Sequence, residues 1–137
     1  MTDVPAHHHA GACLCGAVRF EIEGGFERFY LCHCAYCRKD TGSAHAANLF
    51  SATATLHWRA GQDMATLYRL PGTRHARCFC AVCGSALPYT TGRLLVVPAG
   101  ALDDAFDGTP DAHLFVASRA AWDRGLEHVP AFDGFPS

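Results

Sequence analysis

Seven of the eight cysteines in this chain lie in three short-range groups. The groups are a Cys-x-Cys pair, a Cys-x-Cys-x-x-Cys triplet and a Cys-x-x-Cys pair, formed by Cys13 and Cys15, by Cys32, Cys34 and Cys37, and by Cys80 and Cys83. Such spacing brings two or three thiols within reach of one metal ion, and thiolates are favoured ligands of zinc. Disulfides between cysteines one or two residues apart are disfavoured by the geometry of the bridge. The pattern therefore predicts bound zinc.

The simplest division of the seven ligands joins the two pairs in one four-cysteine site. Gly16 and Gly84 follow these pairs and allow the chain to bend around an ion. The triplet then forms a second site with three ligands, which leaves one coordination position for an outside molecule. Closed four-ligand zinc sites stabilise folds, whereas sites with three protein ligands carry out chemistry. The sequence thus predicts two Zn²⁺ per chain, one structural and one of catalytic type.

A protein ligand could instead complete the triplet site, and both zinc ions would then be structural. The candidates are His33, His45, His75 and Cys78. Cys78 lies two residues before Cys80 and faces the same side of an extended segment, although a buried cysteine more commonly only packs. His33 lies between two ligands and is expected to point away from their metal.

The elements that position these cysteines are mostly strands. Val18, Phe20 and Ile22 alternate with charged residues, which is typical of a half-buried strand directly after the first pair. Residues 28–32 form a predicted strand that leads into the triplet. Further short strands are predicted at residues 46–50, 53–58, 66–70, 75–79, 86–90, 94–98 and 113–117, with Gly- and Pro-containing turns between them. Helix is predicted only as single turns after Cys37 and near residues 118–122.

Length and composition indicate one domain over residues 1–137, with a flexible N-terminus over residues 1–10. The chain is 50 % hydrophobic and 18 % charged, which is typical of a packed globular protein. Its net charge of −2 provides no basic surface for nucleic acid or anionic membranes. No apolar run approaches the ~20 residues of a membrane-spanning helix. Because no secretory signal is recognisable, the chain is expected in the cytoplasm, where thiols stay reduced.

The residues around the cysteines form an ordered series along the chain. They read GACLCGAVRF at residues 11–20, CHCAYCRK at residues 32–39 followed by Thr41-Gly42-Ser43, and RCFCAVCGS at residues 77–85. With flanking residues the series extends from about Gly11 to Pro130. It closely resembles the glutathione-dependent formaldehyde-activating enzyme family, which includes centromere protein V.

This resemblance implies a mostly β structure of the Mss4-like fold, with several small twisted antiparallel β-sheets built around zinc sites. It implies the same division of ligands, in which Cys13, Cys15, Cys80 and Cys83 hold a structural zinc and Cys32, Cys34 and Cys37 hold a catalytic-type zinc. It also implies carbon–sulfur lyase activity on the adduct between a small thiol such as glutathione and an aldehyde such as formaldehyde.

A zinc held by three thiolates suits the binding of a soft thiol better than the activation of water. A bound thiol is deprotonated and remains a nucleophile. Arg38 and Lys39 could offset the added negative charge from the side of a pocket, and the hydroxyls of Thr41 and Ser43 could donate hydrogen bonds to the ligand. His45 and His75 are both suited to proton transfer, and the sequence assigns neither.

Two other functions are compatible with the sequence. A non-enzymatic protein-interaction module would contain two structural zinc ions and contact its partner through an outer β surface. A zinc store or redox switch would require an exposed and readily oxidised Cys78. The sequence leaves open whether the chain forms a homo-oligomer.

Overall fold

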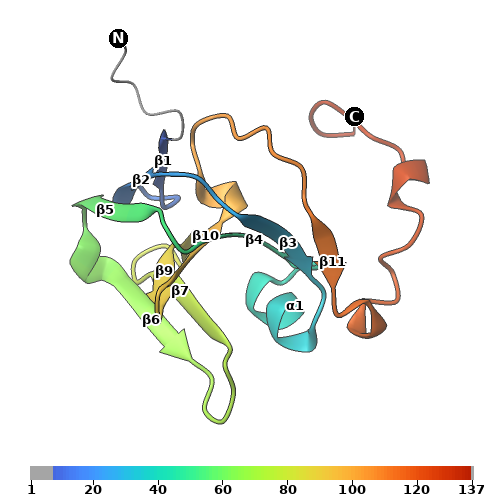
Figure 1. Ribbon diagram of the computed structural model, residues 1–137. Coiled ribbons are helices and arrows are strands. Elements are labelled where there is room, and N and C mark those ends of the chain that lie inside the picture. The colour runs from blue at the N-terminus through green and yellow to red at the C-terminus, as the bar shows by residue number, and fades with distance from the viewer. Residues whose placement is uncertain (1–7, 137) are drawn as a thin grey trace.

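The computed structural model describes residues 8–136 and consists mainly of short strands in three sheets (Figure 1). Neighbouring strands are antiparallel except β11 and β3, which run parallel. In spatial order the first sheet contains β1 (His8–Ala12), β2 (Arg19–Glu23) and β5 (Thr55–Ala60); the second contains β11 (Ala112–Leu114), β3 (Arg28–Cys32), β4 (Ala46–Ser51), β10 (Leu94–Pro98) and β9 (Tyr89–Thr91); the third contains β6 (Ala65–Arg69), β7 (Ala76–Cys80) and β8 (Ala86–Leu87). The predicted mostly β class is confirmed.

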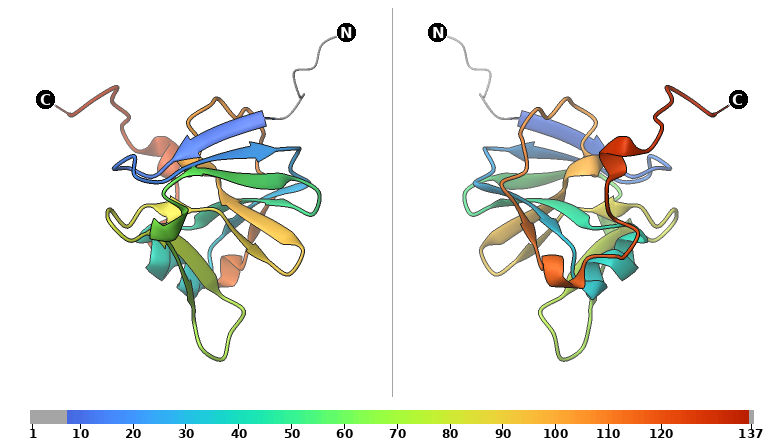
Figure 2. Two further views of the ribbon diagram at one scale, coloured as in Figure 1. Left: turned by 90° about the vertical axis from the view of Figure 1, so that its left-hand side faces the viewer. Right: turned by 90° about the vertical axis from the view of Figure 1, so that its right-hand side faces the viewer.

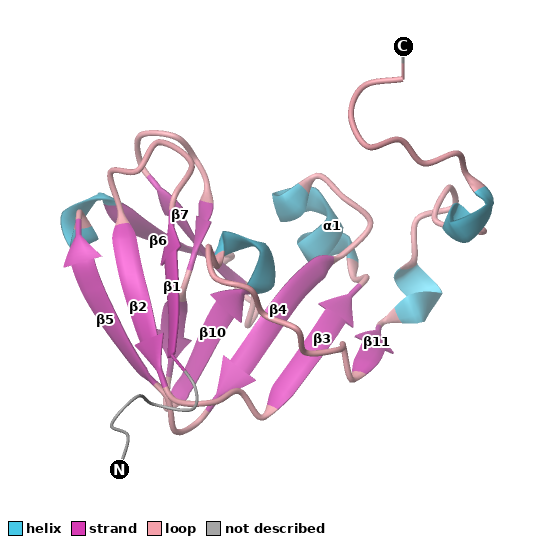
Figure 3. Ribbon diagram, turned by 90° about the horizontal axis from the view of Figure 1, so that it is seen from above, coloured by secondary structure: helices cyan, strands magenta, loops and turns pink. Residues whose placement is uncertain are grey.

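Helices are few and short. The described residues contain one α-helix, α1 (Ala35–Thr41), and four 3-10 turns, η1 (Gln62–Met64), η2 (Ala99–Ala101), η3 (Val116–Ser118) and η4 (Leu126–His128). Seen from above, α1 lies at one end of β3 and β4, and the C-terminal segment continues beyond β11 (Figure 3). The β6–β7 hairpin projects from the body of the molecule (Figure 2). Within residues 8–136, no helix has the length and hydropathy needed to cross a membrane.

The core forms where the inner faces of the three sheets meet. Phe20 and Ile22 of β2 are buried, while the charged residues that alternate with them face outward. They pack in one cluster with residues of β4, β8 and β10, among them Leu49, Leu87 and Val97. Cys13, Cys78 and Cys80 belong to the same cluster, so part of the cysteine chemistry is built into the core.

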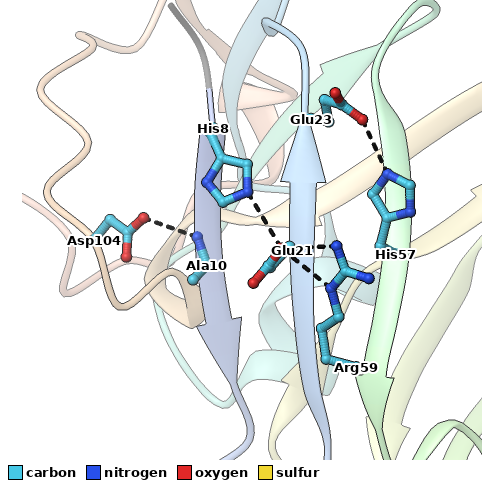
Figure 4. A network of polar contacts seen from close by, with 7 residues as sticks. All are labelled: His8, Ala10, Glu21, Glu23, His57, Arg59 and Asp104. Atoms are coloured by element: carbon cyan, nitrogen blue, oxygen red, sulfur yellow. Dashed lines mark hydrogen bonds and ion pairs between the residues drawn. The ribbon is translucent and has the colours of Figure 1, made fainter. Parts of the chain in front are cut away.

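Polar pairs cover the outer face of the β1–β2–β5 sheet (Figure 4). Glu21 accepts two hydrogen bonds from Arg59 at 3.1 and 3.0 Å, and Glu23 lies 3.1 Å from His57 Nε2. Exposed pairs of this kind contribute little stability. They make this face of the sheet polar and solvent-exposed. Because side chains alternate along β2, Phe20 and Ile22 lie on the opposite, inner face.

Several predicted boundaries need correction. Strand β1 includes residues 8–10 of the segment predicted to be flexible, and residues 1–7 lie outside the described residues. The predicted strand at 86–90 is divided into β8 and β9 at Pro88, which has no N–H to donate. Helix α1 begins before Cys37 and contains it. The last predicted strand ends early because Phe115 has a φ of 58°.

Candidate metal centres

Four thiols meet where the turn after β1 approaches the turn between β7 and β8. The Sγ atoms of Cys13, Cys15, Cys80 and Cys83 all lie within 4.8 Å of one another. The Sγ atoms of Cys13 and Cys15 are 3.6 Å apart. A tetrahedral zinc with Zn–S bonds of ~2.3 Å places its sulfur ligands about 3.8 Å apart. The spacing of this four-thiol cluster therefore fits a closed zinc site.

Two glycines shape the turns that carry these thiols. Gly16 N donates to the carbonyl oxygen of Cys13 at 3.1 Å, and Gly84 N donates to that of Cys80 at 2.7 Å. Their φ angles are 82° and 77°, a left-handed region that glycine enters without the penalty of a side chain. The prediction that these glycines let the chain bend around the cluster is confirmed.

Backbone N–H groups point at the sulfur atoms of the four-thiol cluster. Val18 N donates to Cys13 Sγ at 3.2 Å, and Val82 N donates to Cys80 Sγ at 3.4 Å. Backbone N–H groups of Ser85 and Cys15 lower the pKa of Cys83 to about 6. Such donors favour the thiolate, which is the form that binds a metal.

Three further thiols gather at the junction of β3 and α1. Cys32 ends β3, Cys34 is the N-cap of α1, and Cys37 lies in its first turn. Their Sγ atoms lie within 4.8 Å of one another. Cys37 N donates to Cys34 Sγ at 3.4 Å, so a cysteine occupies the capping position that serine or aspartate usually takes. No other His, Cys, Asp or Glu within residues 8–136 joins this three-thiol cluster.

Burial and hydrogen bonding favour the thiolate unequally in the three-thiol cluster. Burial opposes ionisation of Cys34, but N–H donation from Cys37 and the thiols of Cys32 and Cys37 leave its pKa below the ordinary value. Burial raises the pKa of Cys37, and the neighbouring thiols raise it further. The cluster thus holds one thiolate readily, and ionisation of all three thiols requires a cation among them.

His33 and His45, two of the four candidates for a fourth ligand of the second metal, lie in other surroundings. His33 is fully buried; its Nε2 lies 2.8 Å from His113 Nδ1, and its Nδ1 lies 3.4 Å from Asp123 Oδ2. The ring of His45 stands at 5.2 Å from that of His33. His33 is therefore tied to β11 and the C-terminal segment instead of the three thiols.

Cys78 and His75 also remain outside both clusters. Cys78 is buried in β7, and burial raises the pKa of its thiol. It faces the same side of β7 as Cys80, as predicted, because Ala76, Cys78 and Cys80 are the buried positions of that strand. His75 contacts the carboxylate of Asp40 through Nε2.

A cavity of about 240 Å³ lies beside the three-thiol cluster and is called the inner cavity below. Cys32 and Cys37 line it, together with Cys78, Asp40 and His75. A neighbouring hollow of about 350 Å³, the outer groove, shares Asp40, His75 and Arg77 with it. Ligand sites are concave and partly apolar, and the inner cavity gives such a site direct access to two of the three thiols.

The sequence-based expectation of a pocket beside Arg38 is wrong, whereas the expected hydrogen bonds from Thr41 and Ser43 to a ligand stay predictions. Arg38 does not line the inner cavity, because its Nε donates to the carbonyl oxygen of Ser118 at 3.1 Å. Thr41 does line the cavity, but its hydroxyl donates to the carbonyl oxygen of Cys37 at 2.7 Å. Ser43 contacts Thr41 through its backbone N–H, whereas Lys39 lines the outer groove.

The family model described as glutathione-dependent formaldehyde-activating enzyme matches residues 8–118. The chain belongs to this family. A Halomonas elongata protein that bears the family's name is 33 % identical over 141 residues, which cover 92 % of this chain and 87 % of that protein. A crystal structure of a Rhodobacter sphaeroides protein matches with a TM-score of 0.56 and 28 % identity, covering 76 % of this chain and 98 % of that one.

In this member of the formaldehyde-activating family, sequence reasoning identified the seven clustered thiols and missed their polar surroundings. Asp40, His113 and Asp123 were not singled out. Asp40 and its partner His75 are 35 residues apart, and His33 and His113 are 80 residues apart. No local spacing pattern could signal these contacts, whereas metal-ligand cysteines are recognised by their short-range spacing.

Proposed function

We propose that the protein is a zinc-dependent enzyme of the carbon–sulfur lyase type, which forms or cleaves the adduct between a small thiol and an aldehyde. Family membership supports glutathione as the thiol and formaldehyde as the aldehyde. The observation that carries the proposal is the three-thiol cluster, which has no fourth protein ligand within residues 8–136 and lies on the wall of the inner cavity.

In this proposal the two clusters hold two Zn²⁺ with different roles. Cys13, Cys15, Cys80 and Cys83 supply four ligands to a structural zinc, and the thiol spacing and N–H donors described above fit that role. Cys32, Cys34 and Cys37 supply three ligands to a second zinc. When bound there, zinc supplies a means of deprotonating an incoming thiol while keeping its sulfur nucleophilic.

The size of the inner cavity limits what it can hold. Drug-sized ligands usually occupy ~300–1,000 Å³, and the inner cavity has about 240 Å³. It is large enough for the thiol-bearing end of a ligand and a small aldehyde. The remainder of a peptide-like thiol would extend into the outer groove, where Lys39 and Arg77 provide positive charge for its carboxylates.

The residues of the chain bring the two reactants together. Cys32 and Cys37 define where the thiol sulfur is held, and the cavity wall orients the aldehyde carbon toward it. The carbon–sulfur bond forms as the carbonyl π electrons move to oxygen, and the thiol proton ends on that oxygen. The reverse sequence cleaves an S-hydroxyalkyl adduct. Net charge and atoms are conserved in both directions.

A second candidate function is a non-enzymatic interaction module, which one surface feature favours. The segment after β11 exposes an unusual number of large apolar side chains, namely Phe115, Val116, Trp122, Leu126, Val129, Phe132 and Phe135. Exposed large apolar side chains that gather in one segment can mark a protein interface. This surface lies outside the three-thiol cluster, so it is compatible with catalysis and does not replace it.

Titration of glutathione into the cobalt-substituted protein tests the proposed function. Thiolate coordination changes the charge-transfer bands of Co²⁺, and we expect the change at the three-thiol cluster to saturate. When formaldehyde is then added, the adduct should form faster with the protein than without it, as followed by NMR. If glutathione leaves the Co²⁺ spectrum unchanged and the protein does not accelerate adduct formation, the interaction module is favoured.

A further inference from the structure

A half-buried hydrogen bond between a carboxylate and an imidazole joins α1 to the β6–β7 hairpin. Asp40 Oδ2 contacts His75 Nε2, and the two side chains are 23 % and 17 % exposed. The comparable pair of Glu23 and His57 on the outer sheet face is 55 % and 36 % exposed. A pair held away from water has a fixed geometry that a surface pair lacks.

This pair lies between the two hollows described above. Asp40 and His75 line both the inner cavity, which Cys32 and Cys37 also line, and the outer groove. The ring of His75 packs against that of Tyr36, with centroids 5.5 Å apart. Position and packing therefore hold the imidazole next to the space where a thiol and an aldehyde would meet.

The hydrogen bond to Asp40 determines which nitrogen of His75 is free. A carboxylate only accepts, so Nε2 carries the hydrogen that points at Asp40 Oδ2. Nδ1 then carries the lone pair in the neutral ring, and no hydrogen bond to it is made by other residues within 8–136. An imidazole oriented by a carboxylate, with its second nitrogen available, is the arrangement used for proton transfer in many enzymes.

Other groups on the inner cavity are less suited to move a proton at neutral pH. His75 is the only imidazole among its lining residues in the described part of the chain. Cys78 is buried in β7, and burial raises the pKa of Tyr89, so the phenol stays protonated. The hydroxyl of Thr41 is bonded to its own helix. His45, the other histidine considered from the sequence, does not line the cavity.

We propose that His75 is the proton-transfer residue of the thiol–aldehyde reaction and that Asp40 is its positioning residue; this inference rests on the proposed function. In the synthetic direction Nδ1 accepts the proton that leaves the thiol sulfur, directly or through one water. The sulfur then bonds to the aldehyde carbon, and the imidazolium returns the proton to the oxygen that was the carbonyl. His75 ends neutral, and cleavage of the adduct follows the same steps in reverse.

The test uses the zinc-loaded protein with glutathione and formaldehyde as probes. NMR exchange spectroscopy measures the rate of interconversion between free thiol and adduct, and calorimetry measures thiol binding. General acid–base catalysis contributes about 10²- to 10⁴-fold, so His75→Gln should lower the catalysed rate by that factor. Thiol affinity should stay within about threefold, because the three-thiol cluster is unchanged. Asp40→Asn should lower the rate less, at unchanged affinity.

Matched controls separate catalysis from structure. His57→Gln removes another histidine paired with a carboxylate, on the outer sheet face, and should leave the rate unchanged. His75→Ala should regain activity when imidazole is added, which a purely structural role does not explain. A wild-type rate in His75→Gln would overturn the proposal. So would equal loss of rate, affinity and thermal stability without rescue by imidazole.

Two further outcomes complete the test. If the wild-type protein binds no thiol and accelerates neither direction, the proposed function itself fails, and this inference fails with it. Long-range ¹H–¹⁵N NMR of the unmodified protein needs no variant and should find His75 protonated on Nε2 with Nδ1 bare. A hydrogen on Nδ1 in the neutral ring would contradict the assignment even if the variants fail to fold.

Discussion

At the residue scale, Cys34 occupies the N-cap of α1 and also belongs to the three-thiol cluster. Its sulfur accepts from Cys37 N, and its carbonyl oxygen accepts from Arg38 N at 3.0 Å. One side chain thus begins the helix and takes part in the proposed metal site. The two roles can be separated by substitution, since serine is an equally good helix cap.

Cys34→Ser should therefore fold and lose the second metal. A hydroxyl does not replace a thiolate as a zinc ligand, so metal analysis by mass spectrometry should fall from two zinc ions per chain to one. The thermal unfolding midpoint should change little. The matched control is Cys78→Ala, which removes a thiol that lines the inner cavity but lies outside the cluster, and it should keep both ions. Loss of metal in both variants would contradict the division of ligands proposed above.

At the scale of elements, the segment between β3 and α1 is held from the side of β11 and the C-terminal segment. His33 N donates to the carbonyl oxygen of Leu114 at 2.9 Å. The buried ring of His33 contacts His113 and Asp123, and Asp123 also accepts from Arg119 Nε at 3.2 Å. The position of the three thiols therefore depends on residues about 80 positions later in the chain.

Asp123→Ala should lower the free energy of unfolding by about 1–3 kcal/mol, because it removes the buried carboxylate that accepts from Arg119 and lies 3.4 Å from Nδ1 of the buried His33. Urea denaturation checks this prediction. Asp133→Ala, a substitution of an exposed aspartate in the same C-terminal segment, is the control and should have little effect. Equal stability of the two variants would mean that the Asp123 contact does not help to hold the β3–α1 junction.

Glu27 performs a similar task at the other end of β3. Its carboxylate accepts from Ala52 N at 2.6 Å and from the hydroxyls of Ser51 and Thr53 at 3.1 and 3.3 Å. The backbone N–H of Ala52 is the main cause that holds the pKa of Glu27 below its ordinary 4.5. A lowered carboxyl pKa stabilises the fold above the unfolded-state pKa and loses this effect as pH falls through the folded-state pKa.

Glu27→Gln should therefore be less stable than the wild type between pH 7 and pH 5, with the difference narrowing as pH falls below 4.5. Urea midpoints of both proteins, measured from pH 7 to well below pH 4.5, give the comparison. Glu23→Gln, whose carboxylate pairs only with His57 on the exposed face, should show a much smaller difference. A difference in stability between the wild type and Glu27→Gln that grows toward acid pH would contradict this prediction.

Elements with local signals could be predicted from the sequence. β2, β3 and β10 are each five residues long, and the residues of each strand carry the signal that predicts it. Strand β1 has no alternation like that of β2 and forms because β2 provides its hydrogen-bonding edge, from His8 opposite Glu23 to Ala12 opposite Arg19. The pair of Asp40 and His75 was missed for the same reason, since it exists only after folding brings α1 beside the residue that precedes β7.

At the scale of the whole molecule, the two clusters occupy different environments. In the four-thiol cluster, Cys13 and Cys80 are part of the hydrophobic core, and the cluster joins the start of the chain to its middle. The three-thiol cluster lies at the end of β3 in the five-stranded sheet, and two of its thiols line the inner cavity. In this account, metal binding at the first cluster is coupled to folding, whereas metal binding at the second is coupled to the ligand.

Removal of metal by a chelator should accordingly occur in two steps. The first zinc should leave while circular dichroism still reports the native strands, and thiol binding should be lost at that point. Release of the second should coincide with unfolding, because its ligands hold the core together. Cys80→Ser should abolish the cooperative unfolding transition. Simultaneous release of both ions before any unfolding would contradict the proposed structural role of the four-thiol cluster.

The central claim is that three thiols and no fourth side chain hold a metal that takes an outside thiol. A crystal structure of the zinc-loaded protein with glutathione, phased with anomalous scattering at the zinc edge, tests it most directly. The account predicts two anomalous peaks, one surrounded by Cys13, Cys15, Cys80 and Cys83, and one bound by Cys32, Cys34, Cys37 and the glutathione sulfur. A side chain of this protein as the fourth ligand, or no peak at the three-thiol cluster, would contradict it.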